Sequence, residues 1–119
     1  MRIVCVFPMV TAGDETLKFV FPSKQKAAQQ AIALARQDDR IRRLVVFGSA
    51  VTMRCGTGSD LDIAVDAPSV SEDEFLKIAR GFYRGVDSEV DMIHYNTIRN
   101  SQLKREIDEK GVNIYVKRQ

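Results

Sequence analysis

A glycine-serine pair and two alternating aspartates are the residues of this chain whose types and spacing could do chemistry. Gly48 and Ser49 follow the apolar run at residues 44–47, and Asp60 and Asp62 come after ten intervening residues. Because glycine has no Cβ atom, the backbone at Gly48 can turn sharply and approach a ligand, and the amides that follow can donate to phosphate oxygens. The Ser49 hydroxyl adds a further donor. This layout indicates a site for a metal-bound nucleotide.

The two aspartates stand at alternate positions of a predicted strand. Side chains on a strand alternate between its faces, so Leu61 and Ile63 point to one face, and Asp60 and Asp62 share the other. Their Cα atoms then lie roughly 6.6 Å apart, close enough for both carboxylates to converge on one or two ions. Mg²⁺ suits them, because it favours carboxylate oxygens and keeps positions open for phosphates. Each motif alone is also ordinary turn chemistry.

The combined pattern, Gly48-Ser49 followed by Asp60-Leu61-Asp62, resembles the signature of the DNA polymerase β-type nucleotidyltransferase superfamily, in particular its minimal nucleotidyltransferases. The resemblance covers residues 44–94. It implies that Gly48 and Ser49 hold the triphosphate, and that Asp60, Asp62 and a third acidic residue bind two Mg²⁺ ions. The matching third position is Asp91.

One departure from the family pattern follows the glycine-serine pair. Many members carry an Arg- and Gly-containing stretch there, whereas this chain has Ala-Val-Thr-Met at 50–53 and then Arg54. Arg54 is the nearest substitute for the missing charge.

The first functional hypothesis is an enzyme that moves a nucleoside monophosphate from an NTP, expected to be ATP, to an acceptor hydroxyl. The resemblance implies a partner as well, because many minimal nucleotidyltransferases are antitoxins paired with a helical HEPN-type toxin. A homodimer, a standalone enzyme that modifies a small molecule, and a non-catalytic nucleotide- or partner-binding domain stay open. The acceptor and the preferred base cannot be read from the residues.

Composition bounds these hypotheses. At 119 residues, with 45% apolar and 29% charged residues, the chain is expected to form a single domain over residues 1–119. No apolar run is long enough for a membrane span or a signal peptide, so we expect a cytoplasmic protein. Cys5 and Cys55 lack metal-ligand spacing. The net charge of +2 does not indicate nucleic acid.

The expected fold class is α+β: a small mixed sheet of three core strands, with edge strands, covered by helices as in the nucleotidyltransferase fold. Strands are predicted at residues 44–47, 61–65 and 89–95, with an edge strand at 112–116. Helices are predicted at 22–38 with Ser23 as N-cap, from the capping box at 71–74 to 83, and at 97–110. A β-hairpin from strands 2–7 and 16–21 is expected as an N-terminal extension over residues 1–22.

Several other residues have competing interpretations. Glu89 shares the predicted face of Asp91 and is the substitute third acid, whereas His94 is interpreted as structural. Arg80 and Arg84 complement a helix dipole. Three aromatic residues could stack on a base but favour core packing: Phe82, Tyr83 and Tyr95. Two basic groups are candidate partner surfaces: Arg36, Arg40, Arg42 and Arg43, and at the C-terminus Lys117 and Arg118.

Overall fold

The structure is a computed structural model that describes residues 4–56 and 58–118. Its helices and strands, in chain order, are α1 (Gln25–Arg36), β1 (Arg43–Phe47), β2 (Leu61–Asp66), α2 (Glu72–Gly85), β3 (Val90–His94), α3 (Ser101–Lys110) and β4 (Val112–Val116). Short 3₁₀ helices lie between them: η1 (Glu15–Phe19), η2 (Pro22–Lys24), η3 (Gly48–Val51) and η4 (Tyr95–Thr97).

The four strands form one mixed sheet in the order β3-β2-β1-β4. β1 pairs antiparallel with both β2 and β4, and β2 pairs parallel with β3. α2 connects β2 to β3, as a parallel pair requires. The α+β class and the mixed sheet are therefore confirmed, and the third core strand lies beside the second.

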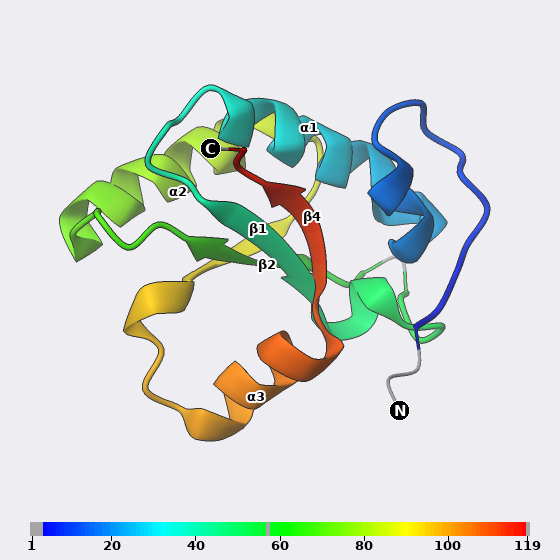
Figure 1. Cartoon of the computed structure of the whole chain (residues 1–119). Coiled ribbons are helices and arrows are strands. Elements are labelled where there is room, and N and C mark those ends of the chain that lie inside the picture. The colour runs from blue at the N-terminus through cyan, green and yellow to red at the C-terminus, as the bar shows by residue number, and fades with distance from the viewer. Residues whose placement is uncertain (1–3, 57, 119) are drawn as a thin grey trace.

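Helices cover both faces of the sheet. α1 and α2 lie on one face and α3 on the other (Figure 1). Leu44 and Val46 of β1 belong to the large core under α1 and α2, whereas Val45 and Phe47 pack with Ile107 of α3. Strand β1 is thus buried from both sides, as its unbroken apolar run predicts. In the described part of the chain, no helix is long and apolar enough to cross a membrane.

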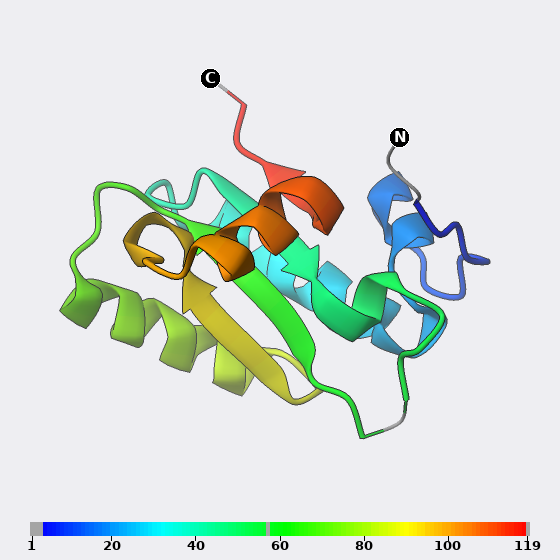
Figure 2. The same cartoon turned by 90° about the horizontal axis from the view of Figure 1, so that it is seen from below.

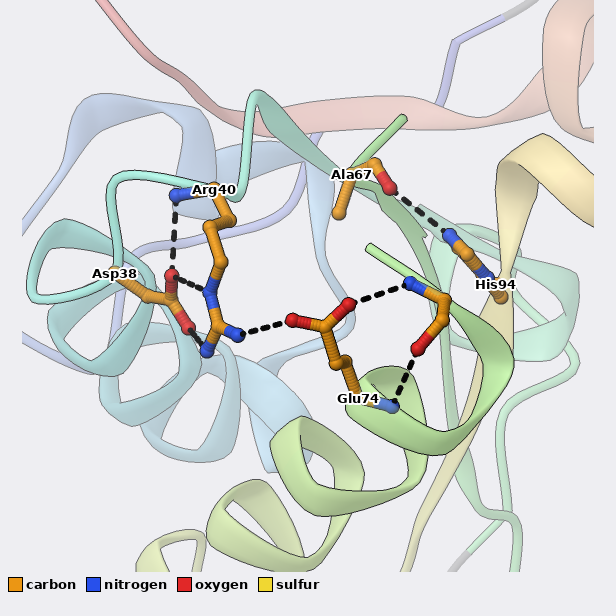
Figure 3. A network of polar contacts seen from close by, with 6 residues as sticks. Asp38, Arg40, Ala67, Glu74 and His94 are labelled. Carbon is orange, nitrogen blue, oxygen red and sulfur yellow. Dashed lines mark hydrogen bonds and ion pairs between the residues drawn. The ribbon is translucent and has the colours of Figure 1, made fainter. Parts of the chain in front are cut away.

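α2 begins where its capping signal predicts. The Ser71 hydroxyl accepts from the Glu74 amide at 3.2 Å, and the Glu74 carboxylate accepts from the Ser71 amide at 3.0 Å. Glu74 also contacts Arg40 at 3.5 Å, and Arg40 pairs with Asp38 at 2.8 Å, as Figure 3 shows. The capping box therefore links the start of α2 to the segment between α1 and β1.

The predicted N-terminal β-hairpin is wrong for the residues that the structure describes. Residues 4–14 have no regular secondary structure, and the expected second strand contains the 3₁₀ helix η1 instead. One bond, from the Phe7 amide to the Lys18 carbonyl at 2.7 Å, joins the two segments. Residues 4–14, the N-terminal arm, are otherwise held by side chains of α1. The Val10 amide donates to the Gln25 side-chain oxygen, and the Asp14 amide donates to that of Gln29.

Two helix starts also differ from prediction. Ser23 lies inside η2 rather than capping α1, which begins at Gln25. α3 begins at Ser101, because the Asn100 side chain accepts from the Leu103 amide at 3.0 Å and so caps the helix. A local cap therefore sets the start of α3, and the 3₁₀ helix η2 displaces the start of α1.

Candidate functional site

The turn after β1 is built for close approach. Gly48 has φ +74°, a left-handed conformation that favours glycine. A Cβ atom at this position would collide with the Oδ2 atom of Asp62. The helix η3 follows at once, and the Thr52 hydroxyl donates to the Ser49 carbonyl at 2.9 Å. The predicted glycine-serine turn therefore lies directly against one of the predicted carboxylates.

The carboxylates meet at the same end of the sheet. Asp62 and Asp91 are direct partners in the parallel register of β2 and β3, and Asp62 is also opposite Phe47, the last residue of β1. Asp60 precedes β2 by one residue. Ala64 and Ile93 lie two residues beyond Asp62 and Asp91 on the same strands, and both pack with α3. Asp62 and Asp91 therefore lie on the sheet face that α3 covers. The structure thus brings together Gly48, Asp62 and Asp91, with Asp60 at the strand start.

The carboxylates on this face repel one another. Partial burial is the largest cause that raises the pKa of Asp62, to about 6, and the carboxylates of Asp91, Asp60 and Glu106 raise it further. A carboxyl group in such surroundings is stabilised by protonation or by a cation. Glu106 on α3 was not predicted, because its role depends on which face α3 covers, and the sequence carries no signal of that.

The acidic residues of this face are the candidate metal ligands. Among the residues that the structure describes, no three acidic, histidine or cysteine side chains converge closely enough to form a metal site as they stand. The chemistry of the donors nevertheless fits Mg²⁺. Asp60 and Asp91 are exposed, Asp62 is partly buried, and all of their ligand atoms are carboxylate oxygens. Mutual repulsion, seen in the raised pKa of Asp62, is the imbalance that divalent cations would remove.

The lone histidine lies on the opposite face. His94 is buried in β3, where its Nε2 atom lies 3.0 Å from the Ala67 carbonyl oxygen (Figure 3). Its ring stacks on Phe75 at 4.8 Å. It points away from Asp91 because the two are three positions apart on a strand. The structural interpretation of His94 therefore fits its surroundings. Glu89, the substitute acid, is exposed just before β3 and offers its carbonyl to the Leu61 amide at 2.9 Å.

The basic cluster lies at the other end of the sheet. Arg43 pairs with Asp66 at 2.8 Å and stacks over Tyr95 at 4.8 Å. A pocket of about 410 Å³ is lined there by Arg40, Arg42, Arg43 and Lys117 with Asp39 and Asp66. Because Arg43 begins β1 and Gly48 follows its end, this cluster is outside the candidate site.

The other candidates do not converge on the site. Phe82 is buried in the core, and Tyr95 donates to Asp108 at 2.6 Å. Tyr83 is exposed on α2 with Arg80 and Arg84. Arg54 is exposed beyond η3, where its amide donates to the Thr52 hydroxyl at 3.1 Å.

Comparisons with known proteins agree with this geometry. The family model described as Polymerase beta, Nucleotidyltransferase matches residues 29–119. Among solved structures, a toxin–antitoxin with AMP-PNP matches with a TM-score of 0.64 at 22% identity, covering 76% of this chain and 74% of the other. A mutant of the toxin–antitoxin MntA-HpeT matches with a TM-score of 0.61 at 19% identity, with the same coverage of 76% and 74%. No curated protein matches in sequence. At these identities the structural likeness shows the fold.

Proposed function

Because this nucleotidyltransferase belongs to the polymerase β nucleotidyltransferase family, we propose that it transfers a nucleoside monophosphate from Mg²⁺-bound ATP to an acceptor hydroxyl. The observation that carries the proposal is the register of Asp62 and Asp91, with Gly48 packed against Asp62. The acceptor oxygen bonds to the α-phosphorus, the bond from that phosphorus to the bridging oxygen breaks, and pyrophosphate leaves.

Each residue of the site is assigned a role in this reaction. Asp60, Asp62 and Asp91 would hold two Mg²⁺ ions, which when bound neutralise phosphate charge and clamp the attacking and leaving oxygens. Gly48 lets its backbone approach the β- and γ-phosphates, and the Ser49 hydroxyl donates to them. Asp91, the more exposed of the two paired strand carboxylates, accepts the proton of the acceptor hydroxyl.

The acceptor is proposed to be on a partner protein, with this chain as the antitoxin of a HEPN-type pair. Both structural neighbours are toxin–antitoxin structures, and one was solved with AMP-PNP, an ATP analogue. The other carries two Asp-to-Glu substitutions two positions apart, the spacing of Asp60 and Asp62. The elements around the site are also few: the three strands and α3 leave Asp60 and Asp91 exposed, so a second surface is needed to position an acceptor.

The test is to incubate the purified chain with ATP labelled at the α-phosphate and Mg²⁺, alone and with the product of the neighbouring gene. Label should appear on the partner protein, and Asp62→Asn should abolish it while leaving the partner bound. Fast labelling of a small hydroxyl compound by the chain alone would instead establish a standalone enzyme. Nucleotide binding without label on any acceptor, partner included, would leave only the binding-domain hypothesis.

A further inference from the structure

Lys24 is a buried cation with almost no partner. Of the described residues, three polar or charged ones are buried: Lys24, Gln25 and His94. Gln25 makes three hydrogen bonds, to the Val10 amide and to the Pro8 and Val20 carbonyls. Lys24, only 6% exposed, makes one side-chain bond, from its Nζ atom to the Ser88 hydroxyl at 3.4 Å. A buried ammonium group is costly unless an anion or several acceptors compensate it.

Hydrogen bonds place Lys24 at the end of the sheet where β1 ends and β3 begins. Its amide donates to the Phe21 carbonyl at 2.8 Å, and the Phe21 amide donates to the Ala50 carbonyl of η3 at 2.7 Å. Its side-chain partner, Ser88, precedes β3 by two residues. The start of α1 therefore lies beside η3 (Figures 1 and 2), and the Lys24 side chain contacts the residue two positions before β3.

Residues next to Lys24 already anchor the loop between α2 and β3 to α1. The α2–β3 loop is tied to α1 through Asp87, whose amide donates to the Gln30 side chain at 2.7 Å and whose carboxylate accepts from Gln30 at 3.0 Å. Lys26 adds an ion pair to Asp87 at 3.4 Å. The loop is thus anchored without Lys24, and the Lys24 ammonium group keeps donors free for a ligand.

The negative charge of a bound triphosphate would supply the anionic partner that Lys24 lacks. Residues 44–62, which carry the turn and the aspartate pair, contain a single cation, the exposed Arg54, and residues 86–94 contain no Lys or Arg. Beyond the Mg²⁺ ions that the proposed function assigns to the carboxylates, a side-chain cation for the terminal phosphates must therefore come mainly from outside these segments. Hydrogen bonds from an ammonium group to phosphate are among the strong ones in proteins.

We propose that Lys24 is a phosphate-binding residue of the nucleotide site, whose Nζ atom donates to the terminal phosphates of the bound NTP from the α1 side of the sheet. This inference rests on the proposed function, since it assigns a ligand to the same site. It predicts discrimination by phosphate number: Lys24 contributes to ATP binding, less to ADP, and nothing to AMP.

The experiment is calorimetric titration of ATP, ADP and AMP with Mg²⁺ into the wild type, Lys24→Met, Lys24→Arg and Ser88→Ala. Lys24→Met should weaken ATP binding by about 10- to 100-fold, the range expected for one charged hydrogen bond, and leave AMP binding unchanged. Lys24→Arg should keep part of the ATP affinity. Ser88→Ala, the matched control, removes the one side-chain partner that Lys24 has in the described part of the chain, and it should keep full affinity.

A second measurement uses the unaltered protein. The NMR signal of the Lys24 ammonium group, assigned by its loss in Lys24→Arg, should shift on addition of ATP and stay in place with AMP. Unchanged ATP affinity in a folded Lys24→Met, equal losses for ATP and AMP, or an unmoved signal would overturn the inference while the proposed function stands. Absence of ATP binding by the wild type would overturn both.

Discussion

Replacing Asp62 by asparagine should stabilise the metal-free protein while abolishing its Mg²⁺-dependent nucleotide binding. The substitution keeps the shape of the side chain and removes a charge that burial, Asp91, Asp60 and Glu106 all disfavour. Most single substitutions of a buried residue destabilise a protein, so a gain in stability is a distinctive outcome.

The magnitude follows from the pKa of Asp62, which rises from the ordinary 3.8 to about 6. At about 1.4 kcal/mol per pKa unit, this difference sets an upper bound of ~3 kcal/mol on the cost of ionised Asp62 in the fold. Solvent reaches part of this side chain, and screening reduces the expected gain to about 1–1.5 kcal/mol. That corresponds to a rise in Tm of ~3–8 °C for a domain of this size.

The stability gain expected from Asp62→Asn depends on pH. A carboxyl group with a raised pKa in the fold binds more protons there than in the unfolded chain, so its destabilising effect appears as the pH rises from 3.8 to about 6. The gain from Asp62→Asn should therefore be full above pH 7, shrink through pH 6 and vanish below pH 4.

The assay is thermal and urea unfolding without metal between pH 4 and 8, with Asp66→Asn as the matched control on the same strand. Burial alone would raise the pKa of Asp66, but hydrogen bonds from Arg43 and Asn96 outweigh it and lower that pKa. Asp66→Asn should hence destabilise the protein at neutral pH. A loss of stability in Asp62→Asn at pH 8, or a gain of the same size at every pH, would refute the reasoning.

Three further predictions concern the turn, the third acid and the α2 cap. Gly48→Ala should destabilise the fold by about 1–2 kcal/mol, since Gly48 has φ +74° and a Cβ atom would meet Asp62; calorimetry should also show a larger loss of ATP affinity than in Ser49→Ala, which removes one hydrogen bond. Asp91→Asn should lower nucleotide transfer by ~10²-fold or more in the labelling assay; a variant with the wild-type rate would exclude Asp91 as the base. Ser71→Ala should cost about 1 kcal/mol in urea unfolding by removing the capping box, and ATP titration should show unchanged affinity because this cap contacts Arg40, at the other end of the sheet from Gly48.

The elements that could be predicted from the sequence are those specified by local signals. The apolar run of β1 and the Ser71–Glu74 capping box each report an interaction within a few residues, and both predictions agree with the structure. The glycine-serine turn and the aspartate pair belong to the same class, because β1 and β2 are neighbours along the chain. Their chemical roles stay predictions.

The misses depend on contacts between distant segments. The N-terminal arm is not a hairpin because its amides bond to the Gln25 and Gln29 side chains, which no strand pattern reveals. Glu106, which raises the pKa of Asp62, and Lys24, which we propose binds phosphate, lie on helices that are neither adjacent to the site in sequence nor marked by a motif. A buried lysine and an exposed one look alike in sequence, so only the fold distinguishes them.

Parallel pairing of β2 with β3 orders the assembly of the site in time. The antiparallel pair β1–β2 closes over the short segment 48–60, whereas β3 must wait until residues 67–89 have crossed over the sheet as α2. Contacts between nearer segments form earlier during folding because less chain entropy is lost. We expect the phosphate turn and Asp62 to meet first and Asp91 to join last. A nascent chain released before β3 docks would therefore hold Gly48 and Asp62 together without Asp91, the proposed base.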